Sequence, residues 1–237
     1  MSEQAADTPV GLLAPAQEIP DDTEPAGAEA AFALAIALER ENDLPGAEDA
    51  YRRADALGHP EAAFYLGGML AEHADFDGAL SLYSRADERG HAAGAFNLGV
   101  LLEHRNDLAG AEAAYRRGDE RGSASAAYCL GMLLAERGDL SHAEAAFRRA
   151  DERGDADAAF SLGGLFVERD DLPSAEAAYR RADERGHVAG TFNLGVLLEY
   201  RGDLAGAEQA YQRAERRGDG EVAEQAAAAL LELAAHR

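Results

Sequence analysis

Residues 94–122 read GAFNLGVLLEHRNDLAGAEAAYRRGDERG, and similar stretches recur along the chain. The Leu-Gly pair in this stretch returns every 32 residues, at Leu66, Leu98, Leu130, Leu162 and Leu194. A period between about 20 and 50 residues is typical of solenoids and propellers, in which each unit packs only against its neighbours. The repeat therefore indicates the class of fold before any single residue is considered.

Each repeat predicts two helices and no strand. Leu98 and Leu102 in the first segment, and Ala111 and Tyr115 in the second, are four residues apart, which gives each segment an apolar helical face. The alternation of a half-buried strand does not persist anywhere in the sequence. We therefore predict an all-α fold, a right-handed α-solenoid of six 32-residue helix-turn-helix repeats followed by a C-terminal capping helix.

Two residue types mark the ends of the second helix in every repeat. An aspartate precedes it, where a carboxylate can accept a hydrogen bond from the free N–H groups of the first turn. A glycine follows it, where a residue in the left-handed conformation ends the helix. The aspartates are Asp43, Asp75, Asp107, Asp139, Asp171 and Asp203, and the glycines are Gly58, Gly90, Gly122, Gly154, Gly186 and Gly218.

Small and aromatic residues also keep the repeat period. Glycine recurs in the first helix and a tyrosine or phenylalanine in the second, so we expect the ring to pack into the space that the glycine leaves. These rings are Tyr51, Tyr83, Tyr115, Phe147, Tyr179 and Tyr211. Another aromatic, Phe96 in the quoted repeat, recurs in the first helices, and we expect packing between helices there rather than a ligand platform.

The chain divides into three parts by composition. Residues 1–27 are acidic and proline-rich without Lys or Arg, which predicts a disordered tail. The six-repeat solenoid occupies residues 28–219, and residues 220–237 form the capping helix. Repeats 92–123 and 188–219 match at 22 of 32 positions, which indicates a duplicated block, so that a binding site in one copy is expected again in the other.

The charge balance limits the choice of partners. The formal net charge is −23, which opposes binding to nucleic acid or to an anionic membrane and favours a partner of basic character. No apolar run has the length of a membrane helix, and the N-terminus lacks the layout of a secretory signal, so we expect a cytoplasmic protein. The single cysteine, Cys129, excludes an internal disulfide framework.

The repeat resembles that of a known family. Counted from Pro60, the Leu-Gly at Leu66, the cap Asp75, Ala79, the ring of Tyr83 and Ala86 stand where the tetratricopeptide repeat has equivalent residues. The join between repeats, RADERGHAAGAFNLG at residues 85–99, is similar to the Sel-one-like repeat. The unit is shorter than the usual tetratricopeptide unit of about 34 residues. The resemblance covers residues 28–219 and implies a stack of helical hairpins.

The resemblance also implies a protein-binding groove lined by the first helices. Asn97 and Asn193 match positions where such proteins use a carboxamide on a ligand backbone, which is reasonable because a carboxamide both donates and accepts. Carboxylates further along these helices would favour a Lys- or Arg-bearing ligand. The alternative for the two asparagines is that polar residues are merely tolerated at these positions. The alternative for the carboxylates is that they lie at a solvated helix end. The full predicted partner-binding set is Asn97, Asn193, Val100, Val196, Glu103, Glu199, His104 and Tyr200.

The sequence predicts neither a catalytic site nor a metal or cofactor site. The seven histidines do not form a compact ligand set, and no histidine is placed by the sequence to activate Cys129. The DERG runs at residues 119–122, 151–154 and 183–186 read as solubilising charge on exposed helices.

We therefore expect a non-enzymatic scaffold or adaptor that binds a protein or peptide. The alternatives are an acidic decoy or regulator of a basic, nucleic-acid-binding protein, and a Sel-one-like hydrolase. Self-association by end-to-end stacking of similar repeats is a further possibility.

Overall fold

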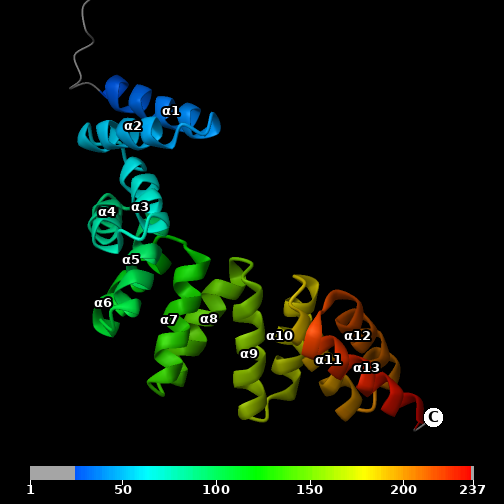
Figure 1. Ribbon diagram of the computed structural model, residues 1–237. Coiled ribbons are helices and arrows are strands. Elements are labelled where there is room, and N and C mark those ends of the chain that lie inside the picture. Colours follow the sequence, from blue (N-terminus) through cyan, green and yellow to red (C-terminus); the bar gives the residue numbers. More distant parts are fainter. Residues whose placement is uncertain (1–24, 236–237) are drawn as a thin grey trace, which may run out of the picture. The chain divides into compact units, whose positions relative to one another are not determined.

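The computed structural model describes residues 25–235, which form thirteen α-helices and no strand (Figure 1). The helices are α1 (Pro25–Arg40), α2 (Leu44–Ala56), α3 (Ala62–Glu72), α4 (Phe76–Glu88), α5 (Ala92–His104), α6 (Leu108–Glu120), α7 (Ala124–Glu136), α8 (Leu140–Glu152), α9 (Ala156–Glu168), α10 (Leu172–Glu184), α11 (Val188–Tyr200), α12 (Leu204–Arg217) and α13 (Gly220–Ala235). The predicted all-α solenoid of paired helices is confirmed. Most of the predicted tail, residues 1–27, lies outside the described residues, and α1 begins within it at Pro25.

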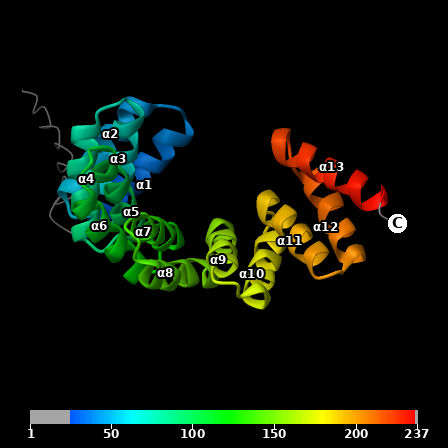
Figure 2. The same ribbon diagram turned by 90° about the horizontal axis from the view of Figure 1, so that it is seen from below.

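The chain divides into two compact units between His59 and Pro60. The first contains the α1–α2 hairpin. In the second, the hairpins α3–α4, α5–α6, α7–α8, α9–α10 and α11–α12 follow one another, each helix packs against the next, and α13 packs against α12 (Figure 2). No helix among the described residues has the length and apolar character needed to cross a membrane.

The predicted caps account for where the second helices begin and end. The aspartates at their starts accept hydrogen bonds from backbone N–H groups, as in the 3.0 Å bond from the Gly110 amide to Asp107 Oδ1. Gly122 has a φ of +93°, the left-handed conformation that glycine adopts most cheaply. Gly218 is an exception, with a φ of −83°, because α12 is one residue longer than the other second helices of this unit and Gly220 takes the positive φ instead.

Contact between a glycine and a ring holds each hairpin of the second unit together, as predicted. Tyr115 is buried, and a Cβ added to Gly99 would lie 2.5 Å from its ring. The first-helix aromatic packs on the same ring, since the centroids of Phe96 and Tyr115 are 6.0 Å apart. The other hairpins of the second unit repeat the glycine contact, at Gly67–Tyr83, Gly131–Phe147, Gly163–Tyr179 and Gly195–Tyr211.

Ion pairs join successive hairpins, and here the prediction of merely solubilising charge in the DERG runs is wrong. Asp119 is only 3% exposed, and its Oδ2 accepts bonds from Arg149 at 2.8 and 2.6 Å while its Oδ1 accepts one from Arg153 at 2.6 Å. Both arginines belong to the following hairpin. The same clamp recurs at Asp87 with Arg117 and Arg121, at Asp151 with Arg181 and Arg185, and at Asp183 with Arg213 and Arg217. A buried carboxylate needs such partners, so this charge is structural.

A candidate protein-binding groove

The eight predicted partner-binding residues lie on two first helices, four on α5 and four on α11, at equivalent positions. Asn97 and Asn193 are partly buried, whereas Val196 and Tyr200 are 46% and 78% exposed. The end of α11 therefore presents apolar surface to solvent, although Leu197 and Leu198 beside it are buried.

The two asparagines meet the tyrosine of the preceding hairpin. Burial raises the pKa of the Tyr179 hydroxyl, and a hydrogen bond with the Asn193 side chain offsets part of the rise. Asn97 and Tyr83 have the same relation, and there the charge of Glu72 raises the pKa further. Since a carboxamide has two N–H donors and an oxygen with two lone pairs, this bond leaves capacity for a ligand.

The two glutamates brace their own hairpins. Glu103 Oε2 accepts a 2.7 Å hydrogen bond from the Tyr115 hydroxyl, and Glu199 Oε2 accepts a 2.7 Å bond from Tyr211. Burial and then this bond raise the pKa of both tyrosines well above the ordinary value. Glu39 holds Tyr51 in the same way in the first unit. The two predicted glutamates thus join the two helices of their own hairpins. The pattern within one helix does not reveal this role, because the tyrosine partner lies on the other helix.

A groove of about 400 Å³ brings three of the α11 residues together. It lies where α11 meets the α9–α10 hairpin, and most of its wall is apolar. Its lining consists of Val167, Asp170, Leu172, Tyr179, Asn193, Val196, Leu197 and Tyr200. The sequence predicted Asn193, Val196 and Tyr200 but missed the residues that the preceding hairpin contributes. One of the missed residues, Leu172, could have been found from the sequence, because an apolar residue follows every cap aspartate.

The equivalent groove at α5 differs from the one at α11. It measures about 480 Å³ and includes His104, but Asn97, Val100 and Glu103 do not line it. Its wall contains Phe76 where the α11 groove has Leu172. The expected duplication therefore gives two grooves in equivalent places with different side chains.

Burial and distance limit the chemistry of the remaining candidates. Cys129 is partly buried, and burial raises the pKa of its thiol to about 11, so the thiol is protonated at neutral pH. Within residues 25–235, no group of three His, Cys, Asp or Glu side chains is placed to hold a metal ion.

Solved structures similar to this chain are helical-repeat proteins. A protective antigen of uropathogenic Escherichia coli with an SLR fold, c5321, is 19% identical with a TM-score of 0.72, and the match covers 81% of this chain and 46% of that one. This chain thus spans about half of that protein. A Sel1 repeat protein from Oxalobacter formigenes is 24% identical with a TM-score of 0.72, covering 80% and 86% of the two chains.

A third similar structure is that of YrrB, described as a TPR protein with an unusual peptide-binding site. It is 20% identical with a TM-score of 0.53, and the match covers 76% of this chain and 98% of that one. At these identities, the three likenesses establish the fold. No curated protein sequence matches the chain.

The family model described as tetratricopeptide repeat matches residues 19–58, 72–126, 128–189 and 165–222, which is most of the chain. The hairpins, cap positions and ring contacts of this chain agree with that match, and the chain belongs to the tetratricopeptide repeat family.

Proposed function

We propose that this protein is a non-enzymatic scaffold or adaptor that holds a protein or peptide partner of basic character in the groove at α11. The observation that carries the proposal is the convergence of exposed apolar side chains there. Val167 and Val196 are 43% and 46% exposed, and Tyr200 is 78% exposed beside the carboxamide of Asn193. An apolar surface with a few polar groups, here the side chains of Asn193 and Asp170, is the usual composition of a recognition site.

Family and charge support the same proposal. Tetratricopeptide repeat proteins typically act as protein–protein interaction scaffolds, and one similar structure is described as having a peptide-binding site. The net charge of −23 attracts a basic partner. The predicted α5 residues Asn97, Val100, Glu103 and His104 are proposed as a second contact region, and the cytoplasm as the location.

Two alternatives have less support. A hydrolase would need an activated nucleophile, whereas the raised pKa of Cys129 keeps its thiol protonated. An acidic decoy would need unpaired carboxylates at phosphate-like spacing, and four aspartates of the second helices are taken up instead by internal pairs with two arginines each: Asp87, Asp119, Asp151 and Asp183.

Selection from a random peptide library, followed by calorimetry with the chosen peptides and the full chain, tests the proposal. We expect Tyr200→Ala to weaken binding at least about tenfold, as truncation of a central aromatic contact does. Leu231→Ala is the matched control, because Leu231 is 75% exposed on α13 and lines no described groove. Selected peptides whose affinity is the same for both variants would contradict the groove assignment, and failure to select any peptide would contradict the function.

A further inference from the structure

We propose that the second unit binds an extended polypeptide along a row of grooves at its hairpin junctions, and that the polypeptide carries an apolar side chain next to a Lys or Arg at a regular interval of about three to six residues. The proposal rests on the proposed function and identifies the class of partner. It concerns three grooves, called here the junction grooves: one between α4 and α5, one between α6 and α7, and the α11 groove described above.

The junction grooves are repeats of one site. Each lies between the start of a second helix and the C-terminal half of the next first helix. The same two repeat positions line all three, with Phe76 and Leu101 in the first groove, Leu108 and Leu133 in the second, and Leu172 and Leu197 in the third. The second groove measures about 360 Å³, close to the 480 and 400 Å³ of the others. The junction of α8 with α9 has Leu140 and Leu165 at these positions.

Most of the apolar residues at the start of the second helices are exposed, although Leu172 is partly buried against the core. Phe76 and Leu108 are 51% and 46% exposed, and Leu140 and Leu204 are exposed as well. The cap aspartate before each of them already accepts a hydrogen bond from a free N–H of the first turn, so the apolar residue after it is not needed for capping. Large apolar side chains exposed at a constant interval instead form the surface that a partner would cover.

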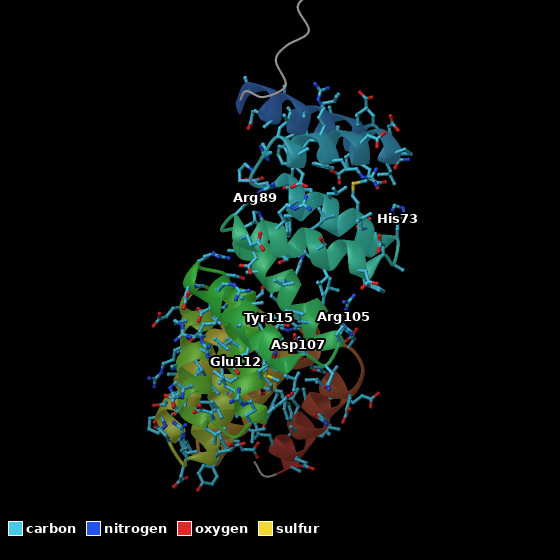
Figure 3. All side chains as sticks on the ribbon, turned by 90° about the vertical axis from the view of Figure 1, so that its left-hand side faces the viewer. His73, Arg89, Arg105, Asp107, Glu112 and Tyr115 are labelled. Carbon is cyan, nitrogen blue, oxygen red and sulfur yellow. The ribbon has the colours of Figure 1, made fainter. Side chains whose placement is uncertain are left out.

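The charge of the junction grooves specifies the polar part of the ligand. Each groove has one more carboxylate than arginines: Asp75 and Asp77 against Arg105 in the first, Glu112 and Glu136 against Arg137 in the second, and Asp170 alone in the third. Figure 3 labels Arg105 at the end of α5 and Glu112 on α6.

The arginines of these grooves are already neutralised, which leaves free carboxylates. Arg105 pairs with Asp77, and Arg137 pairs with Glu112. Glu136 and Asp170 are exposed and have no ion-pair partner among the described residues. An apolar wall beside an unpaired carboxylate fits a leucine-like side chain next to a Lys or Arg.

The repeat geometry sets the ligand's spacing. Packed helices lie about 8–10 Å apart, and an extended chain advances about 3.4 Å per residue. One junction follows the next after two such packing steps, from α5 to α6 and from α6 to α7, so neighbouring junctions are about 10–20 Å apart. About three to six residues therefore cover this distance, and a ligand with an anchor at every third residue has an anchor at either end of that range. Linked anchors add their binding as long as all can reach their sites, so affinity rises with the number of anchors.

The test uses labelled peptides acetyl-(Leu-Lys-Gly)n-amide, with n from one to five, and fluorescence anisotropy with the full chain. We expect at least about a tenfold gain in affinity from n = 2 to n = 4. A peptide with the same composition in blocks of Leu, Lys and Gly, and a peptide with Glu in place of Lys, should each bind at least about tenfold more weakly. Affinity that does not change with n, or equal binding of the block peptide, would overturn the proposal.

A matched pair of variants connects the result to the junction grooves. Leu108→Ser should weaken the n = 4 peptide at least about fivefold, while Leu231→Ser, which removes an equally large exposed side chain from α13, should leave it unchanged. Equal affinities for Leu108→Ser and the unchanged chain would refute the row of grooves. If library-selected peptides still lost affinity with Tyr200→Ala, the proposed function would stand without this extension.

Discussion

Replacement of Asp119 by Asn tests whether the buried clamp between hairpins stabilises the solenoid. The carboxylate accepts bonds from two arginines of the next hairpin at 2.6–2.8 Å, and a carboxamide in its place would keep the shape but lose the charge and one acceptor oxygen. Breaking a fully buried pair costs about 3–5 kcal/mol. The side chains of Arg149 and Arg153 are 42% and 28% exposed and can regain water, so we expect a lower value, about 2–3 kcal/mol.

Thermal and urea unfolding of the full chain, followed by circular dichroism, measure this loss. A change of about 2–3 kcal/mol corresponds to a fall in Tm of roughly 4–12 °C for a protein of this size. Glu120→Gln is the matched control, because this substitution removes the same charge from the neighbouring residue, whose side chain is exposed. A double-mutant cycle with Arg153→Gln isolates the pair from its surroundings. The clamp has no stabilising role if Asp119→Asn and Glu120→Gln agree within about 0.5 kcal/mol.

Three further predictions concern the hairpins of the second unit. Gly99→Ala should destabilise the protein by about 1–2 kcal/mol, because the added Cβ would lie 2.5 Å from the Tyr115 ring. Gly164→Ala has open space around its Cβ and should be neutral or stabilise the protein by up to about 1 kcal/mol. Urea unfolding of the two variants compares them. Ala74→Gly should stabilise by about 1 kcal/mol, since Ala74 has a φ of +62°, and an unchanged urea midpoint would contradict this. Burial lowers the pKa of His91 below its ordinary 6.5, so the stability that neutral His91 contributes is present above pH 6.5 and is lost as pH falls through the folded-state pKa. His91→Ser should therefore reduce the loss of stability in acid. Identical pH profiles of the melting temperature for the variant and the unchanged chain would disprove this.

Acid should also weaken the clamps between hairpins. Burial alone would raise the pKa of Asp119, but the hydrogen bonds from Arg149 and Arg153 outweigh burial and hold the pKa below its ordinary 3.8. Asp87 and Asp183 are shifted in the same direction for the same reasons. A lowered pKa means that the stability is fully present above about pH 4 and is lost as pH falls through the folded-state value.

Local signals allowed most of the fold to be predicted from sequence. Asp107 and Gly122 mark helix ends because a cap acts on backbone groups within a few residues of itself. The contact between Gly99 and Tyr115 was also predictable, since both residues belong to one hairpin and recur together. Each of these features depends on a sequence separation shorter than one repeat.

Contacts between hairpins were less accessible to sequence reasoning. Asp119 stands beside Glu120 and Arg121 in a run that looks like a solvated helix surface, while its partners lie 30 and 34 residues further on. The α11 groove was predicted in part for the same reason. Asn193 and Tyr200 are on the predicted helix, whereas Val167 and Leu172 come from the preceding hairpin.

The clamps also determine how this protein can change in length. Within the second unit, each of the hairpins α5–α6, α7–α8 and α9–α10 gives an aspartate to the hairpin that follows and two arginines to the hairpin that precedes it. Insertion or loss of one whole 32-residue segment inside the array would therefore keep every aspartate matched to its arginines. A tandem gene duplication in this region would yield a protein in which every clamp aspartate already has its two arginines. The same property makes the chain a suitable framework for engineered variants of graded length.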